Sequence, residues 1–459
     1  MQPFTLGSTL KHYSLIKQKG YKLTDVLIWL CTIQTMGSSI YQVTCQELSN
    51  RILCGEKCVY YRLMENPQIN WRGLYRRILL KYYEIVKCKG EEPSEAVTRC
   101  LIIDDTLIEK TGKFIEGVSK VFDHVQHKSV LGLKILVLGY WDGVTFLGVD
   151  FSVHHELGKN KKGGLTKKEQ RLQHTKVREK DGCTAERKKE LDESKIDSAI
   201  KMIKRTDKLG FLVDYVLTDS WFTCIELIKV VRTILKGKVH FLGMVVMNRH
   251  KFEHKGKLYT TSGLVALLER NASQYSRKFK CRHLDVVVNF QGVDLKIFLI
   301  KYGAKGNFRA VVTTNLKLKF VDMMDVYKIR WSIEVFFKEC KQYLMLGKYQ
   351  STNFDAQIAS MTVTMITHTV LTLEKRFTSY QTMGELFRET QKNLLEFTLW
   401  ERLNTVIIEL INLLMDLCEI DIDELMERIL NNEQYEKQYN VMLMALKTMN
   451  QGNGLKQAV

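Results

Sequence analysis

Residues that interrupt or cross-link a fold are scarce in this sequence. Only 3 of its 459 residues are proline, so long proline-rich linkers are excluded. The longest apolar stretch, residues 359–373, is broken by threonine and histidine and is too short to span a membrane. No apolar segment follows the first charges of the N-terminus, as it would in a secretory signal. We therefore expect a folded protein of the cytoplasm that does not associate with membranes.

The 11 cysteines do not form a paired framework. Cys54 and Cys58 are four residues apart, but no second pair of cysteines or histidines follows at the spacing of a zinc finger. Buried or incidental thiols therefore explain these two residues better than a metal site does. We expect the thiols to be reduced.

Positive charge is in excess. Lysine and arginine number 69 against 51 aspartate and glutamate residues, which gives a net charge of +18 and favours a polyanionic partner. Part of this excess lies in residues 158–190, which hold 12 basic and 5 acidic residues. This segment is either a solvated loop or an arm that contacts phosphates, and its composition fits both.

The pattern of apolar residues divides the chain into regions. Residues 1–95 have the spacing of helices and end in a polar joint. In residues 96–249 strands are expected at 100–103, 134–139, 144–153, 213–217 and 240–247, with helices at 194–205 and 221–235. This order predicts an α/β fold with an RNase H-like core, in which helices flank a mixed sheet.

The second half of the chain completes this core after an insertion. Residues 250–320 have the composition of strands and are expected to form a β-rich insertion. Residues 321–376 return to a helical pattern that belongs to the core. Residues 377–459 are also expected to be helical, and the leucine and isoleucine spacing at 399–430 fits dimerisation and core packing equally well.

Three acidic residues occupy positions that suit metal binding. Asp105 and Asp219 each end an apolar strand, and Glu334 lies in a helical segment. Carboxylates at strand ends and on a neighbouring helix can gather oxygen ligands for Mg²⁺. Each also has a simpler explanation, as part of a turn, as a helix N-cap or as one partner in a surface ion pair. Taken singly, none of the three residues is specific.

The neighbours of Glu334 make it more informative. Tyr327, Arg330, Glu334 and Lys341 fall within an arc of roughly 60° if the segment is one regular helix. The spacing Tyr327-x2-Arg330-x3-Glu334-x6-Lys341 resembles the YREK signature of the insertion-sequence-4 family of bacterial transposases. Asp105 in IIDDT and Asp219 in LTDSW resemble the first two acids of that family's DDE triad. The resemblance extends over about residues 98–345.

The resemblance implies a site and its cofactor. Asp105, Asp219 and Glu334 would be the catalytic residues and would hold two Mg²⁺ ions, with Mn²⁺ as an alternative metal and no small-molecule cofactor. The residues implied to contact DNA are Tyr327, Arg330 and Lys341. Trp331 could support a flipped base, although a place in the core explains a tryptophan equally well.

The resemblance also implies a function and partners. Residues 1–95 would recognise the terminal inverted repeats of a mobile element, and the core would cut the element ends and join the 3′-OH groups to target DNA. The partners would be double-stranded DNA and a second copy of the chain on that DNA, at the bacterial nucleoid. A nuclease that cuts without strand transfer and an inactive DNA-binding regulator are the alternatives.

The first acid of the triad has two candidates. Asp104 and Asp105 point to opposite faces of the sheet if the strand continues through both. The family's first acid commonly precedes a threonine, and Asp105 is followed by Thr106. We therefore favour Asp105, and Asp104 would then make a turn or support the site from behind.

Overall fold

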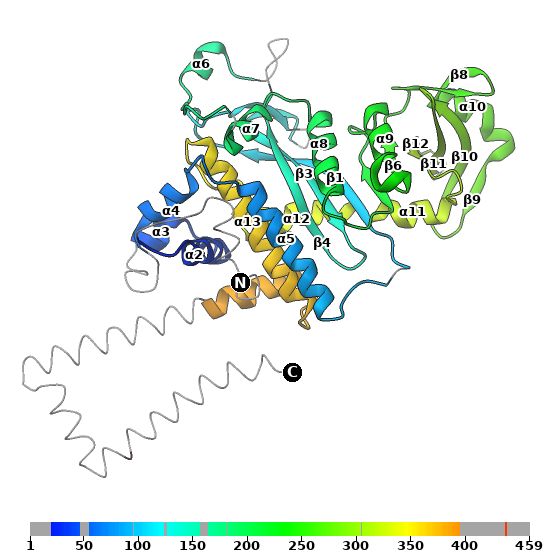
Figure 1. The fold of residues 1–459 in the computed structure, drawn as a ribbon. Helices are drawn as coiled ribbons and strands as arrows, with labels where there is room; N and C mark the ends of the chain where they lie inside the picture. The colour runs from blue at the N-terminus through cyan, green and yellow to red at the C-terminus, as the bar shows by residue number, and fades with distance from the viewer. Residues whose placement is uncertain are drawn as a thin grey trace, which may run out of the picture. The chain divides into compact units, whose positions relative to one another are not determined.

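The computed structural model describes residues 20–45, 55–94, 96–123, 126–156, 164–180, 182–303, 305–394 and 437. The chain divides into two compact units, residues 1–391 and 392–459. Nearly all of the described residues belong to the first unit, which is coloured along the chain in Figure 1. Residues 383–394 are helical, whereas the predicted helical stretch at 399–430 lies outside the described residues.

The described N-terminal residues form helices α2 (Leu23–Thr35), α3 (Ile40–Cys45), α4 (Lys57–Met64) and α5 (Trp71–Cys88). Helix α5 begins after Asn70, whose side chain accepts a hydrogen bond from the backbone N–H of Gly73. Its buried residues recur every three or four positions, and this face packs against α13 (Phe354–Arg376). Among the described helices, even the 23-residue α13 does not combine the length and apolar character that a membrane crossing needs.

A mixed sheet forms the centre of the unit. It contains β1 (Cys100–Glu109), β3 (Lys128–Trp141), β4 (Phe146–His154), β5 (Tyr215–Thr218) and β6 (His240–Val245) in the order β4-β3-β1-β5-β6. Strands β1, β5 and β6 are parallel, whereas β3 is antiparallel to both β1 and β4. The short β2 (Ser119–Asp123) pairs with the first residues of β3. Every residue of β4 is buried, as expected for a sheet covered on both faces.

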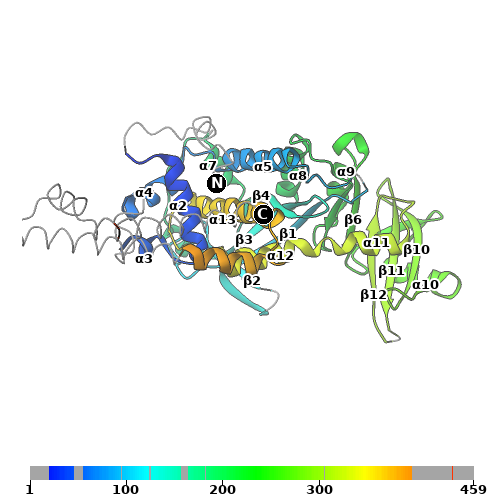
Figure 2. The same ribbon diagram turned by 90° about the horizontal axis from the view of Figure 1, so that it is seen from below.

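Helices α8 (Lys195–Asp207) and α12 (Trp331–Tyr343) cover opposite faces of this sheet (Figure 2). Asp105 of β1 contacts Lys195 at the start of α8, and the next residue, Thr106, contacts Lys341 of α12. Because successive side chains of a strand point to opposite faces, the two helices must lie on different sides. Helix α9 (Ile225–Val231) and the 3-10 turn η3 (Ile234–Gly237) pack against α8.

A glycine allows α12 and α13 to approach β4 closely. A Cβ atom added to Gly148 would lie 3.0 Å from the ring of Phe336 in α12 and 3.5 Å from the methyl group of Met365 in α13. The backbone carbonyl of Gly148 also accepts a hydrogen bond from the hydroxyl of Tyr75 in α5. The N-terminal helices and the C-terminal part of the core are therefore joined to the same strand.

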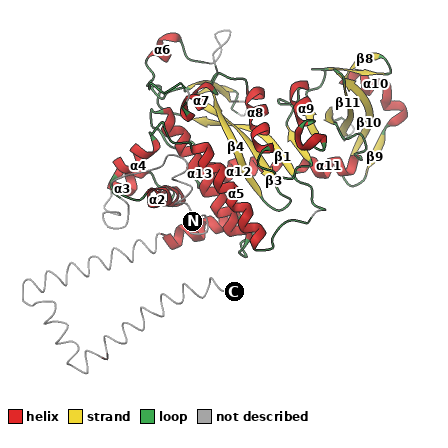
Figure 3. Ribbon diagram, viewed as in Figure 1, coloured by secondary structure: helices red, strands yellow, loops and turns green. Residues whose placement is uncertain are grey.

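The predicted β-rich insertion extends the central sheet. It comprises β7 (Lys251–His254), β8 (Lys257–Thr260), α10 (Thr261–Ala272), β9 (Gln274–Ser276), β10 (Cys281–Phe290), β11 (Val293–Tyr302) and β12 (Phe308–Thr313). Strand β12 pairs antiparallel with β6, so one sheet runs from the core into the insertion (Figure 3). Gln291 and Gly292 make the turn between β10 and β11 with positive φ angles of 50° and 87°. Two positive φ angles are what a tight two-residue hairpin turn requires.

Three expectations from the sequence need correction. Strand β1 does not end at Asp105 but continues to Glu109, because the 14-residue β3 supplies pairing partners as far as Gly132. Helix α10 lies within the insertion, where only strands were expected. The segment around Glu334 is two helices, α11 (Phe320–Lys328) and α12, so the predicted arc does not describe it as one regular helix.

The joint between α11 and α12 is a tighter helical turn. The backbone at Ile329 and Arg330 keeps right-handed helical angles. However, the N–H of Arg330 bonds to the carbonyl of Tyr327 at 3.1 Å, and that of Ile333 bonds to the carbonyl of Arg330 at 3.3 Å. These are three-residue spacings, as in a 3-10 helix, and they end the regular α-helical hydrogen bonding.

The basic segment 158–190 is more ordered than either sequence interpretation suggested. Its described residues include α6 (Lys167–Arg171) and α7 (Cys183–Lys189), while residues 157–163 and 181 lie outside the described part. Arg178 pairs with the carboxylates of Glu116 at 2.7 Å and Asp355 at 2.8 Å. Arg178 is therefore part of the folded interior and is not available to DNA.

We expect Arg178→Gln to lower the free energy of unfolding by about 3 kcal/mol, because it leaves two buried carboxylates with only the longer contacts to Lys188 at 3.4 Å and Lys176 at 3.6 Å. The exposed fraction is 6% for the Arg178 side chain, 5% for Glu116 and 0% for Asp355. Urea denaturation measures the change. The control is Lys81→Gln, which removes the exposed pair with Glu84 and should cost less than about 1 kcal/mol. Equal losses in the two variants would contradict the structural role of Arg178.

Candidate active site

The parallel pairing of β1 with β5 brings three acidic residues to one edge. The last paired residues are Ile103 and Thr218, and Asp104, Asp105 and Asp219 follow them directly. Beyond Ile103, the described part of β1 pairs with β3 alone. The space beside β1 at the end of β5 is therefore open to side chains from neighbouring elements.

A cleft of about 610 Å³ lies at this edge. Its lining includes two carboxylates, two amino groups and an indole, from Asp105, Asp219, Lys195, Lys341 and Trp221. The Nζ atom of Lys195 lies 2.6 Å from Oδ2 of Asp105 and 4.9 Å from the centre of the Trp221 ring. The side chain of Trp221 is 47% exposed, so its ring is accessible from the cleft.

A turn fixes the carboxylate of Asp219. Its Oδ1 atom accepts hydrogen bonds from the backbone N–H groups of Trp221 at 2.9 Å and Phe222 at 3.2 Å. The helix predicted from residue 221 begins only at Ile225, and Cys224 is its N-cap residue. Asp219 thus caps a turn and not the helix itself. Within the described part of the chain its Oδ2 atom forms no hydrogen bond, and that atom is available to a ligand.

Arg330 bridges Asp104 and Glu334 on the face of β1 opposite to Asp105. Its Nη1 atom lies 3.0 Å from Oδ2 of Asp104, and its Nη2 atom lies 2.6 Å from Oε1 of Glu334. The hydroxyl of Tyr327 donates a hydrogen bond to the carbonyl of Thr218 at 3.0 Å. Tyr327 therefore ties α11 to the end of β5, and Arg330 links β1 to α12.

The remaining predicted DNA contacts differ in their surroundings. The Nζ atom of Lys341 donates to the hydroxyl of Thr106 at 2.7 Å, beside the cleft. Trp331 is 62% exposed, so the alternative of a core tryptophan is wrong. Lys341 and Trp331 are therefore accessible to a large ligand, whereas the hydroxyl of Tyr327 is engaged within the protein.

The gathered acids hold protons more tightly than usual. Burial, together with the charge of Asp219, raises the pKa of Asp104 to about 7, although Arg330 acts in the other direction. Burial also raises the pKa of Asp219, and the charge of Asp105 adds to this, while the two backbone N–H bonds oppose it. Burial and neighbouring negative charge therefore outweigh the groups that stabilise the ionised carboxylates.

The donor atoms of this site suit a hard divalent cation. Carboxylate oxygens are the ligands that Mg²⁺ and Mn²⁺ prefer, and a cation would counteract the burial and the neighbouring negative charge that raise the pKa of Asp104 and Asp219. As the described side chains lie, no three acidic, histidine or cysteine residues are grouped closely enough to hold a metal ion. Lys195 neutralises Asp105 and Arg330 neutralises Glu334, so a metal would take the place of these cations.

Comparison with known proteins identifies the family. A family model described as "Transposase DDE domain" matches residues 95–370, more than half of the chain. The matched range begins just before β1 and ends within α13, so it includes the whole acidic edge. No curated protein matches the chain. The protein is a transposase-type enzyme with metal-dependent chemistry, and the chain belongs to the DDE transposase family.

Two residues of the cleft were not found from the sequence. Lys195 begins the predicted helix at 194–205, but it is 90 positions away from Asp105, and only the fold brings the two together. Trp221 stands two residues after Asp219 in LTDSW, where the motif could have suggested it. Both residues contact or border the acids that the sequence did identify.

We expect the free energy of unfolding to fall as the pH rises from about 4 to about 7 in metal-free buffer. Folded Asp104 has a pKa of about 7 against 3.8 in the unfolded chain, so protonation favours the folded state and deprotonation removes that stability. The slope approaches about 1.4 kcal/mol per pH unit for one such group. Urea denaturation of Asp104→Asn at several pH values should give a flatter dependence.

The control for this experiment is Asp322→Asn, at an exposed position near the start of α11. It should retain the slope of the unmodified protein. A slope that is unchanged in Asp104→Asn would show that this carboxyl group does not titrate in the expected range.

Proposed function

We propose that this protein excises a mobile element by cut and paste and joins its ends to new DNA. One observation carries the proposal: Asp105 and Asp219 line one cleft where β1 and β5 end their pairing, and Lys341 lines the same cleft. Two carboxylates beside a phosphate-binding cation are what cleavage of a phosphodiester requires. Glu334 lies on the helix that carries Lys341.

Supporting evidence for an RNase H-like core comes from the strand order. Along the chain, β1, β3 and β4 come first and are followed by α8, β5, α9 and β6. In the sheet these strands lie in the order β4-β3-β1-β5-β6, and β1, β5 and β6 are parallel. In this proposal residues 96–249 and 321–376 form the core, and 250–320 is an insertion. The spacing from Tyr327 to Lys341 supports membership of the insertion-sequence-4 group within the family.

The acidic residues would bind the metal ions that the reaction needs. Two bound Mg²⁺ or Mn²⁺ ions would supply an activated water and neutralise the charge that develops on the phosphate. Asp105 and Asp219 would offer carboxylate oxygens from the two strands, and Asp104, which shares with Glu334 the face of β1 that Arg330 bridges, is the alternative first ligand. Glu334 becomes available as the third ligand when Arg330 exchanges its carboxylate partner for a DNA phosphate, since one guanidinium cannot serve both fully.

The surrounding residues would hold the DNA. Lys341 contacts a phosphate at the edge of the cleft, and the exposed indole of Trp331 offers a surface on which a base can stack. Tyr327 keeps its predicted place in the DNA-binding set, and its bond to β5 also positions the acidic edge.

The proposed transposition reaction determines which partners the protein needs. The substrates are double-stranded terminal inverted repeats, recognised by the helices of residues 1–95, and target DNA. Two element ends must be held together, which favours a homodimer on DNA, with residues 377–459 as the candidate contact. We place this activity at the nucleoid in the bacterial cytoplasm, where the DNA lies.

We expect cleavage of a labelled duplex carrying the element's terminal repeat to depend on Mg²⁺ and to fall about 10²-fold or more in Asp219→Ala and Glu334→Gln. Both changes remove a carboxylate from the site. DNA binding, measured by fluorescence anisotropy, should be nearly retained in both. The matched control is Glu339→Gln in the same helix, whose side chain bonds to His368 and does not line the cleft.

The products separate the proposal from its alternatives. Joined products from pre-cut ends support transposition, whereas cleavage without joining would identify a nuclease. Specific binding without any cleavage in the unmodified protein would identify a DNA-binding regulator. Loss of DNA binding in Glu334→Gln would show that this residue does not have the metal-binding role proposed for it.

We expect Lys341→Met to weaken DNA binding to a similar extent for all sequences and to reduce the slope of log affinity against log salt by about 1, because one phosphate contact is lost. Binding titrations at several salt concentrations measure the slope. The control is Lys208→Met at the far end of α8, where the slope should not change. A slope that stays constant in Lys341→Met would remove this residue from the DNA interface.

A further inference from the structure

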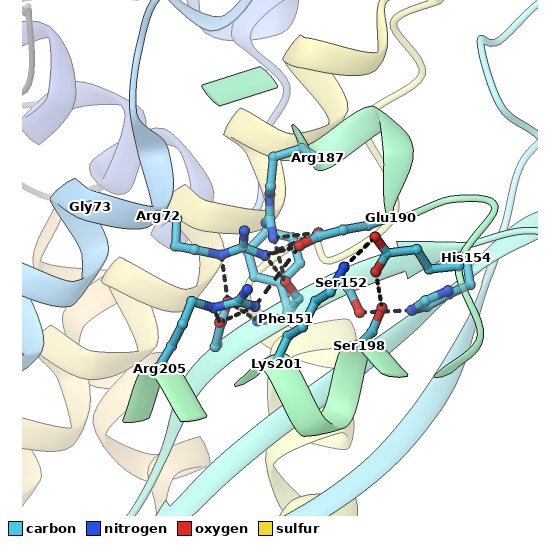
Figure 4. A network of polar contacts seen from close by, with 12 residues as sticks. Arg72, Gly73, Phe151, Ser152, His154, Arg187, Glu190, Ser198, Lys201 and Arg205 are labelled. Carbon is cyan, nitrogen blue, oxygen red and sulfur yellow. Dashed lines mark hydrogen bonds and ion pairs between the residues drawn. The ribbon is translucent and has the colours of Figure 1, made fainter. Parts of the chain in front are cut away.

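A cluster of arginines lies where α5, α7 and α8 meet β4, apart from the acidic cleft (Figure 4). Arg72 contacts Asp150 at 2.9 Å and Glu190 at 2.7 Å. Arg205 also contacts Asp150, at 2.8 Å, and Arg187 contacts Glu190 at 3.1 Å. Three guanidinium groups from three helices therefore share two carboxylates.

A pocket of about 190 Å³ adjoins this cluster, with space for roughly six water molecules. All three arginines line it, and so does Arg76, one helical turn beyond Arg72 in α5. Arg76 is half-buried and forms no ion pair within the described part of the chain. The exposed Glu186 also lines the pocket. Four guanidinium groups thus face three carboxylates, and one positive charge is left over.

Arg187 provides hydrogen-bond donors that the protein does not use. Only 4% of this residue is exposed, yet its Nε and Nη2 atoms have no hydrogen-bond partner in the described structure. Its guanidinium group lies 4.1 Å from the centre of the Phe151 ring, and its Nη1 atom donates to the carbonyl of Phe151. Burial and the charge of Arg72 lower the pKa of Arg187 to about 10. Buried donors without partners are rare in folded proteins and indicate a missing acceptor.

The start of α5 adds to the positive potential. Asn70, Trp71, Arg72 and Gly73 at the N-terminus of this 18-residue helix all line the pocket. The helix dipole places partial positive charge at that end. An anion in the pocket would therefore meet the helix terminus, the unused donors of Arg187 and the unpaired guanidinium of Arg76 together.

We propose that this pocket binds a phosphate group. A planar carboxylate presents its acceptors in one plane, whereas a tetrahedral phosphate presents oxygens in several directions, as donors arriving from three helices require. The phosphate is either inorganic phosphate or a phosphate of DNA, and the chemistry of the pocket is the same for both. This inference does not rest on the function proposed for the acidic cleft.

The test uses the full-length protein without divalent metal, titrated calorimetrically with inorganic phosphate, with chloride at equal ionic strength as the reference. One phosphate should bind saturably per chain and raise the melting temperature. Arg76→Gln should weaken this binding about tenfold or more, because it removes one charged hydrogen bond. The matched control Arg77→Gln changes the next residue of α5, which is exposed and does not line the pocket. It should bind phosphate normally.

Arg187→Gln should abolish binding, and if this buried substitution prevents folding, Arg76→Gln decides the question. A DNA duplex then separates the two sources. Displacement of phosphate by the duplex identifies a DNA phosphate as the occupant, and retention of phosphate under saturating duplex identifies the free ion. Absence of saturable phosphate binding, or equal affinity in Arg76→Gln and the unmodified protein, would overturn the proposal.

Discussion

The hydrogen bonding between β1 and β5 ends at Ile103 and Thr218, and the acidic edge exists because the two strands differ in length beyond that point. Strand β1 continues to Glu109 on its pairing with β3, whereas β5 turns away at Asp219. A longer β5 would pair with β1 beyond Ile103 and would close the cleft. The bond from Tyr327 to the carbonyl of Thr218 holds α11 at this same point. The end of β5 therefore determines where α12 and its residue Glu334 lie relative to the acidic edge.

Carboxylates gathered in this way repel one another, and the protein offsets the repulsion with side-chain cations. Lys195 forms an ion pair with Asp105 on one face of the sheet, and Arg330 forms ion pairs with Asp104 and Glu334 on the other. Burial and the charge of Asp219 still raise the pKa of Asp104, against the effect of Arg330. A fully neutralised site would be more stable but would have less to gain from a divalent cation. In the proposed function, a metal and a DNA phosphate would have to displace these ion pairs.

The sequence predicted the alternation of strands and helices because apolar runs and turns are local signals. It could not predict the end of β1, which depends on pairing with β3 as far as Gly132, or the break before α12, where the local composition remains helical. Asp105, Asp219 and Glu334 were identifiable because the first two follow apolar strand sequences and the third lies in a helical segment with the Tyr, Arg and Lys spacing. Lys195 was not, since a lysine at a helix start has no distinctive pattern until Asp105 lies beside it. The exposure of Trp331 likewise depends on which face of α12 meets the sheet.

Helix α8 gives a physical connection between the acidic cleft and the arginine cluster. Lys195 at its start contacts Asp105, and Arg205, roughly 15 Å along the axis, contacts Asp150 of β4. If α8 moves as a rigid element, a phosphate that draws Arg205 toward the proposed pocket would also shift Lys195. The proposed metal site would require the same release of Asp105 from Lys195. Because any coupling between two ligands is reciprocal, a phosphate that eases this release would itself bind more tightly when the metal is present.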